Sequence, residues 1–289
     1  MSPSTPAKWG LRGLAFGYLG LLLLAPVGLI FYKTFEHGIG APLDAMTTPE
    51  AVHAIQLTLL MVAIAVPLNT IFGVGCALLL VRHRSWSNGV IDAIINLPFA
   101  ISPIVIGLSL YLLYGNTGWF GPTLEDLGVQ MLFSWPAMVL ASIFVSLPFV
   151  VREVVPVLHE IGTEQEQAAS TLGANGWQTF WRVTLPAIRW GVAYGVVLTT
   201  ARVLGEFGAV TIVSGSISGE TETMPLFVAK AFEQFNEEAA YAGAIVLALL
   251  ALTTLLLMSI GGRRAKSSGA PIPSVAEVPV PTSNTKENP

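Results

Sequence analysis

Six long apolar runs, separated by shorter polar segments, constrain this chain more than any other feature of its sequence. Each is long enough to cross a hydrocarbon core of ~30 Å as a helix, which takes about 20 residues. The runs span residues 13–32, 54–81, 90–114, 131–151, 190–213 and 239–261. Because lipid offers no hydrogen-bond partners to the backbone, such runs fold as helices. The sequence therefore predicts an all-α membrane protein of about six transmembrane helices.

The composition agrees with a chain embedded in lipid. Charged residues make up 11% of it and the mean hydropathy is +0.67, whereas soluble domains carry about 25% charged residues. The net charge of −4 gives no basic surface for nucleic acid, which excludes that class of partner. Cys76 is the one cysteine, so a disulfide within the chain and a cysteine-based metal site are excluded, and we expect a small buried apolar side chain.

The distribution of lysine and arginine predicts the orientation, because short cytoplasmic loops carry an excess of both. With six crossings, Lys33 and Lys230 fall on one side of the membrane. The other side holds Lys8, Arg12, Arg82, Arg84, Arg152, Arg182, Arg189, Arg263, Arg264, Lys266 and Lys286. We therefore expect both termini in the cytoplasm, with residues 1–12 before a retained first helix and residues 263–289 as a disordered Ser/Pro-rich tail.

The cytoplasmic loop 152–189 is predicted to be structured. Thr163 and Glu166 have the spacing of a capping box that opens a short helix, and Gly173 would end it. The apolar face of this helix would consist of Ala168, Ala169 and Leu172.

A second helical segment is predicted after Gly176, with Trp177, Phe180 and Trp181 at helical spacing. A helix-break-helix of this kind either lies on the membrane surface or docks into a groove of a partner protein. Periodicity alone slightly favours the membrane surface.

Two charges interrupt the fifth apolar run. Arg202 and Glu206 lie one helical turn apart, and an arginine at mid-bilayer costs roughly 2.5–3.5 kcal/mol, so it should face protein or water. They form either a structural ion pair in the bundle interior, which we favour slightly, or a site where Glu206 holds Arg202 as a transient ligand for an anion. The two roles are compatible. Close helix approach is expected at Gly205, Gly208, Gly191 and Gly195.

Motifs for catalysis are absent from the sequence. No lysine follows a glycine, which excludes a phosphate-binding Walker loop. His159-Glu160 begins like a zinc helix, but Thr163 occupies the position of the second histidine. There is no nucleophile elbow and no redox cysteine pair. We expect no cofactor and no catalytic residue, with the energy source on another chain or in an ion gradient.

The segment around Gly173 resembles the signature loop of bacterial ABC importer permeases. Gln167-Ala168-Ala169, Gly173 and Val183-Thr184-Leu185-Pro186 follow that family's pattern of Glu-Ala-Ala, three residues, Gly, nine residues and Ile-x-Leu-Pro. Gln167 stands at the glutamate position and Val183 at the isoleucine position. Gln167 carries no charge, and Glu166 would point about 100° away on the helix, so we do not expect it to replace the glutamate.

Five further stretches are similar to the sulfate/thiosulfate permease family, W subunit. They are 97–103, 133–136, 148–153, 205–210 and 213–217, and the resemblance extends from about residue 9 to 260. It implies a type I ABC importer permease fold, with a transmembrane domain at 13–262 and a core at about 53–260. The implied function is that of a permease subunit of an ATP-driven sulfate/thiosulfate importer in the bacterial inner membrane.

The resemblance also implies partners and site residues. The partners are a homologous T-type permease, two ATPase subunits that hydrolyse ATP, and a sulfate-binding protein. The ATPase-coupling loop would use Glu166, Gln167, Ala168, Ala169, Gly173, Gly176, Leu185 and Pro186, with Pro186 starting the fifth helix. Candidates for a pathway or gate are Arg202, Glu206, Ser102, Thr199 and Thr200, although helical hydroxyls more often bond to a backbone carbonyl.

Two alternatives stay open. A permease for molybdate or another oxyanion would carry the same loop. An ion-coupled secondary transporter would need carboxylates within the membrane, and Glu206 is the one clear case.

Overall fold

The computed structural model describes residues 13–14, 16–36, 38–83 and 88–266, which contain helices and no strand. Four helices are long and apolar enough to cross a membrane, namely Phe16–Phe35, Pro49–Arg82, Trp135–Ile161 and Glu237–Thr254. Two bent helix pairs bring the number to six if each pair is one span. The predicted all-α fold with about six spans is confirmed. The expectations for residues 1–12, Arg84 and residues 267–289 lie outside the described residues.

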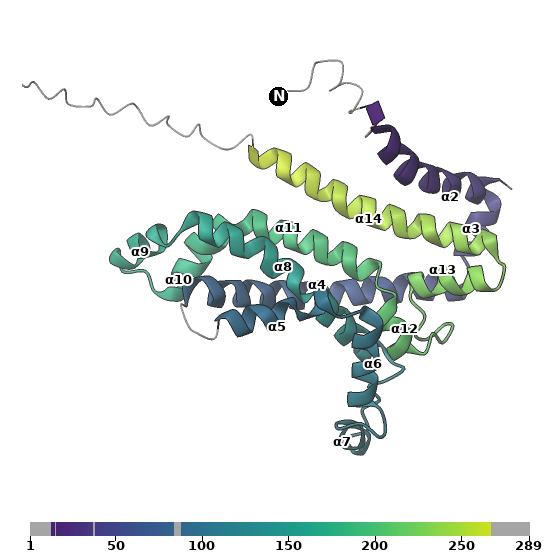
Figure 1. Ribbon diagram of the computed structural model, residues 1–289, viewed down its shortest axis with the longest axis horizontal. Helices are drawn as coiled ribbons and strands as arrows, with labels where there is room; N and C mark the ends of the chain where they lie inside the picture. Colours follow the sequence, from purple (N-terminus) through teal and green to yellow (C-terminus); the bar gives the residue numbers. More distant parts are fainter. Residues whose placement is uncertain (1–12, 15, 37, 84–87, 267–289) are drawn as a thin grey trace, which may run out of the picture.

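Three helices form the centre of the bundle: α4 (Pro49–Arg82), α8 (Trp135–Ile161) and α11 (Leu185–Leu204), with α5 (Asn88–Ala100) on their flank (Figure 1). Val150 on α8 lies between α4 and α11. A Cβ at Gly73 would come within 2.7 Å of the Val150 Cβ, and one at Gly195 within 2.8 Å of its Cα. These two glycines therefore let both neighbouring helices approach the α8 backbone.

The apolar core of the bundle consists of two clusters. One joins the first halves of α4 and α8 to α6 (Pro103–Tyr114), α12 (Gly208–Ser214) and α13 (Met224–Glu233), and the other joins the second halves of α4 and α8 to α5 and the start of α11. Cys76 packs against the second cluster but is half-buried rather than fully buried, which corrects the expectation for it. Asn69 lies between the two clusters on α4 and is fully buried.

The first and last spans lie side by side along one edge of the bundle (Figure 1). The first contains η1 (Gly20–Leu24) and α2 (Ala25–Phe35), and the last is α14 (Glu237–Lys266). The α3 helix (Gly40–Met46) joins them at one end of the molecule. Because α14 continues to Lys266, the predicted start of the disordered tail at residue 263 is wrong for residues 263–266.

The third apolar run, predicted as one crossing, bends by 108° between α5 and α6. Ser102 has an extended backbone (φ −60°, ψ 136°) and Pro103 occupies the first turn of α6. Proline disfavours helical geometry at the preceding residue and has no N–H to continue the helix, which explains the bend. As a result, α6 and α7 (Gly121–Asp126) project from the bundle (Figure 1).

The fifth apolar run differs from prediction at both ends. Its helix begins at Gly176, continues through α10 (Gly176–Thr179), the π segment η2 (Phe180–Thr184) and α11, and then bends by 53° before α12. Pro186 lies in the first turn of α11, as expected, but α11 continues directly from η2, so the proline is inside the continuous helix rather than at its start. The wider turns of η2 directly before the proline accommodate a residue that lacks an N–H, so the helix is not interrupted.

Candidate functional site

Two short helices, α9 (Glu164–Thr171) and α10, form a structured element at one end of the bundle (Figure 1). We call residues 162–179 the α9–α10 element. None of the residues in α9 or α10 is buried. The predicted loop 152–189 is therefore shorter than expected, because α8 extends to Ile161 and the next helix begins at Gly176.

Gly173 ends α9, as the sequence predicted. Its backbone is left-handed (φ +87°), the N–H of Gly173 donates to Ser170 O at 3.0 Å, and the N–H of Ala174 donates to Ala169 O at 3.0 Å. This is a Schellman motif, which satisfies the last carbonyls of a helix. A Cβ at Gly173 would meet nothing within 4 Å, so glycine is required here by backbone conformation rather than by space.

The predicted capping box of Thr163 and Glu166 is not formed. Thr163 has a helical backbone without a side-chain cap, and its hydroxyl accepts a 3.0 Å hydrogen bond from Nε2 of Gln167. The Glu166 carboxylate does not bond to the backbone of Thr163 but forms an ion pair with another helix. A capping box does exist at α10, where the N–H of Gln178 donates to Asn175 Oδ1 (2.8 Å) and the N–H of Asn175 donates to Gln178 Oε1 (3.1 Å). The Asn-x-x-Gln spacing before an aromatic helix was its sequence signal.

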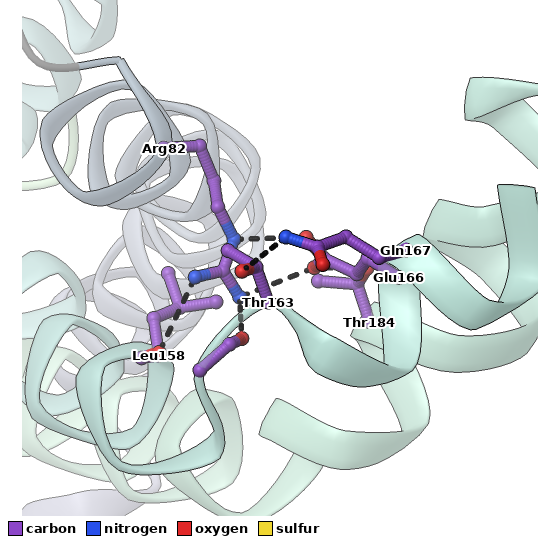
Figure 2. A network of polar contacts seen from close by, with 7 residues as sticks. Arg82, Leu158, Thr163, Glu166, Gln167 and Thr184 are labelled. Carbon is purple, nitrogen blue, oxygen red and sulfur yellow. Dashed lines mark hydrogen bonds and ion pairs between the residues drawn. The ribbon is translucent and has the colours of Figure 1, made fainter.

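Glu166 instead binds Arg82, the last residue of α4 (Figure 2). Nε of Arg82 lies 2.9 Å from Oε2 of Glu166, and Nη2 donates to Oε1 at 3.2 Å. The hydroxyl of Thr184 in η2 donates to the same Oε1 at 2.8 Å. Gln167, which holds the glutamate position of the family pattern, is exposed and bonds within α9. The charge at position 166 therefore faces the bundle.

Arg82 is a further residue of the candidate site, and the sequence indicated it only as a charge that orients the chain in the membrane. It also donates to the carbonyl of Gly162 at 2.7 Å and to that of Leu158 at 3.5 Å, at the end of α8. A cation at the end of a span together with a glutamate on a neighbouring loop was the available signal, but a single sequence does not show which charges meet.

The outer side of the α9–α10 element is apolar and exposed. Leu172 is 89% exposed and Trp177 71%, and Trp181, which follows the element in η2, is 51% exposed. A groove of about 810 Å³ that includes Leu172, but neither tryptophan, is lined by Ile161, Gln165, Ala168, Ala169, Leu172, Arg182, Val183, Pro186, Ala187 and Arg189. Among the other predicted loop residues, Gly176 is exposed and Leu185 is half-buried against the bundle. Exposed apolar side chains of this kind are typical of a surface that docks into a partner protein or lies on a membrane.

Arg202 and Glu206 form the predicted ion pair, with Nη1 of Arg202 2.6 Å from Oε2 of Glu206. Glu206 lies in the break between α11 and α12, and its side chain is 1% exposed against 28% for Arg202. Oε1 of Glu206 accepts a 3.0 Å hydrogen bond from the N–H of Ala209. The carboxylate thus neutralises Arg202 and caps the start of α12.

Among the described residues, none of the three predicted pathway hydroxyls forms a hydrogen bond with this pair. Ser102 is exposed at the bend between α5 and α6, with no side-chain cap. Thr200 donates to Val196 O at 2.8 Å, as helical hydroxyls commonly do. Thr199 is fully buried, and its hydroxyl has no hydrogen-bond partner within the part of the chain that the structure describes.

The breaks of the two bent spans are neighbours. A Cβ at Gly208, the first residue of α12, would lie 3.1 Å from the Cβ of Pro103, the first residue of α6. Gly208 therefore permits the expected close approach, and so do Gly191 and Gly195 against α8. Gly205 does not, since a Cβ there would meet only the Ala201 carbonyl at 3.6 Å. Across the described ranges, no three His, Cys, Asp or Glu side chains are grouped to hold a metal ion.

Comparison with known proteins gives matches over most of the chain. A family described as "Binding-protein-dependent transport system inner membrane component" matches residues 69–267. The sulfate transport system permease protein CysW of Synechococcus elongatus is 50% identical over 250 residues, covering 86% of this chain and 87% of that protein. CysT of Escherichia coli K12, a sulfate transport system permease protein, is 37% identical over 248 residues, with coverages of 86% and 89%.

The fold is also found in a solved structure. A chain of a bacterial ABC transporter involved in the import of the polysaccharide alginate matches with a TM-score of 0.75 at 19% identity, covering 90% of this chain and 96% of that one. At this identity the likeness concerns the fold, which is that of an ABC importer permease. The chain therefore belongs to the family of binding-protein-dependent transport system inner membrane components, and within it to the CysW group of permease proteins.

Proposed function

We propose that this chain is a membrane-spanning permease subunit of an ATP-driven sulfate/thiosulfate importer. The observation that carries the proposal is 50% identity to a sulfate permease along 87% of that protein's length. The described helices fit a multi-pass protein of the inner membrane. The excess of lysine and arginine in alternate loops supports a cytoplasmic location for both termini and for the α9–α10 element.

The proposed complex has four further subunits. A homologous T-type permease completes the pathway, two ATPase subunits hydrolyse ATP, and a sulfate-binding protein delivers the anion. This chain has no Walker loop, so in the proposal it hydrolyses no ATP itself and needs no cofactor. The relative CysT supports the existence of a second permease of the same fold.

The α9–α10 element is the proposed contact with an ATPase subunit. Its outer face exposes Leu172 and Trp177 to solvent, which suits docking into a cleft. When the ATPase dimer closes, it would draw the two such elements of the complex together. Because the helix is continuous from Gly176 to Leu204, this displacement would be passed to the Arg202–Glu206 pair and would change access to the pathway.

For the pathway we propose Arg202, Glu206, Ser102, Thr199 and Thr200. A pathway for a dianion needs polar groups and a balanced positive field rather than a strong cationic site that would retain the ion. Arg202 is partly exposed and is neutralised by Glu206, and Ser102 is exposed. Arg202 and Ser102 therefore fit a role in the anion pathway best. Thr199 is buried within this chain and would act through packing.

The experiment is uptake of radiolabelled sulfate by a bacterial strain that lacks its own sulfate permeases and expresses this chain with its partner subunits. We expect uptake that disappears when the ATPase subunits carry an inactivating Walker lysine substitution. Uptake that persists without ATP hydrolysis would establish an ion-coupled transporter instead. Labelled molybdate, offered in the same cells, tests the alternative oxyanion: preferential molybdate uptake would overturn the assignment to sulfate.

A further inference from the structure

Arg82 contacts two helical elements besides its own, the end of α8 and α9, at the end of the bundle that carries the α9–α10 element. We propose that Arg82 is a positioning residue that locks this element to α4, so that movement of the element is passed to α4 as well as to α8 and α11. The inference deepens the proposed function and rests on it for the role of the element in coupling.

The first support is the contact between Arg82 and the end of α8. The carbonyls of Leu158 and Gly162 are among the last of that helix and have no N–H partner further along it. A guanidinium satisfies such carbonyls and also complements the negative end of the helix dipole. Gly162 has φ +63° and ψ −158°, a conformation that favours glycine, and its carbonyl accepts the 2.7 Å bond from Arg82.

The second support is the way Glu166 is held. Both of its oxygens face the guanidinium, and one also accepts from Thr184 on the helix that follows the element. The side chains of Arg82 and Glu166 are only 15% and 22% exposed, so water competes less for them than for a surface ion pair. Figure 2 shows the carboxylate lying between the ends of α4 and η2. A two-point, charge-assisted contact of this kind fixes orientation as well as distance.

The third support is connectivity. The α9–α10 element is joined covalently to α8 and, through η2, to α11, but α4 enters this region from a different part of the chain. Among the polar contacts of the described residues, those of Arg82 join the end of α4 to the element. With this contact, the element and the three central helices form one body. Without it, the end of α4 has no polar contact with the element among the described residues, and α4 follows α8 only through packing and the hydrogen bonds of Asn69.

The first experiment measures amide hydrogen exchange in the purified full-length chain, at the peptide that contains α9. Glu166→Gln keeps the size of the side chain and an acceptor for Thr184 but removes the charge. We expect exchange in α9 to rise about 2- to 30-fold, the range for a modest coupling contact. Arg82→Lys, which keeps the charge but not the fork, should fall between wild type and Glu166→Gln. The matched control is Glu160→Gln at an exposed glutamate near the end of α8, where exchange should not change.

The second experiment measures sulfate imported per ATP hydrolysed by the assembled transporter in proteoliposomes. We expect Glu166→Gln to lower this ratio about 2- to 30-fold with ATP hydrolysis retained, and Glu160→Gln to leave it unchanged. An unchanged ratio in Glu166→Gln would overturn the coupling role. If the wild-type assembly moves no sulfate, the proposed function and the coupling role fail together. Even then, unchanged exchange in Glu166→Gln would separately show that Arg82 does not hold the element.

Discussion

Asn69 on α4 donates a 2.7 Å hydrogen bond to the hydroxyl of Ser146 on α8, at a depth where both residues are fully buried. The same amide donates to the carbonyl of Ile143 at 3.1 Å. The two parallel helices are thereby joined between two apolar clusters, where packing alone tolerates sliding along the axis. The bond therefore fixes the register of α4 on α8.

Asn69→Ala should destabilise the protein by about 1 kcal/mol, because buried polar contacts between membrane helices contribute around this amount. Thermal unfolding of the purified protein in detergent measures the change. Asn116→Ala replaces an exposed asparagine and serves as the control, with no expected effect. Equal unfolding temperatures for the two variants would mean that the Asn69 bonds do not stabilise the bundle.

Gly195→Ala should destabilise the protein by about 1–3 kcal/mol, since the new methyl group would press on the α8 backbone beside Val150. Gly75→Ala is the matched control on α4, because a Cβ there meets nothing within 4 Å. Alanine is a better helix former than glycine, so this control should be neutral or more stable by up to about 1 kcal/mol. Unfolding in detergent distinguishes them, and a loss in both would contradict the packing argument.

Arg202→Ala should destabilise the protein and lower transport, because it leaves the buried Glu206 carboxylate without its cation. We expect about 3 kcal/mol, the low end for a broken buried pair, since Arg202 is partly exposed. Glu206→Gln should cost less, about 1 kcal/mol, because the remaining arginine is partly exposed and the amide still accepts from Ala209. Unfolding and sulfate uptake are measured on both variants. Equal costs would show that the asymmetry in burial has no energetic consequence.

Gly173→Val should reduce sulfate import per ATP hydrolysed while membrane insertion stays normal. A β-branched residue with φ near +87° is strained by about 1–2 kcal/mol, which would displace the end of α9. Gly173→Asn tolerates left-handed geometry and should retain most of the coupling. Fractionation of membranes and the ratio of uptake to hydrolysis check the two variants. Normal coupling in Gly173→Val would remove the argument for a fixed break at this position.

The spans and the identity of the α9–α10 element were predictable from the sequence, because hydropathy and the Gly173 signal are local. The directions in which the helices run were not predictable. The 108° bend at Ser102 lies inside one apolar run, and hydropathy is the same for a straight and a bent helix. The prolines nearby indicated a kink. Because membrane helices often tolerate proline, however, no single proline showed where the helix bends.

The sequence predicted which residues belong to the candidate site but, for most of them, not which residues they contact. Thr163 and Glu166 had the spacing of a capping box, but Glu166 gains more from Arg82, which is 84 residues away in the chain. Arg202 and Glu206 were found correctly because their contact spans a single helical turn. Ser102 and Thr199 were chosen by residue type, and burial then separated them.

The π segment Phe180–Thr184 determines the rotational orientation of the α9–α10 element about the axis of α11. A π turn accommodates an additional residue relative to an α turn, so deletion of one residue there would leave the orientation of the preceding segment unchanged, whereas the same residues in α geometry would rotate that segment by about 100°. In α geometry, the indole of Trp177, which precedes the segment, would therefore point toward a different part of the surface at this end of the bundle. The segment thus rotates the α9–α10 element about the helix axis without interrupting the helix, and it determines the side from which the proposed partner would have to bind.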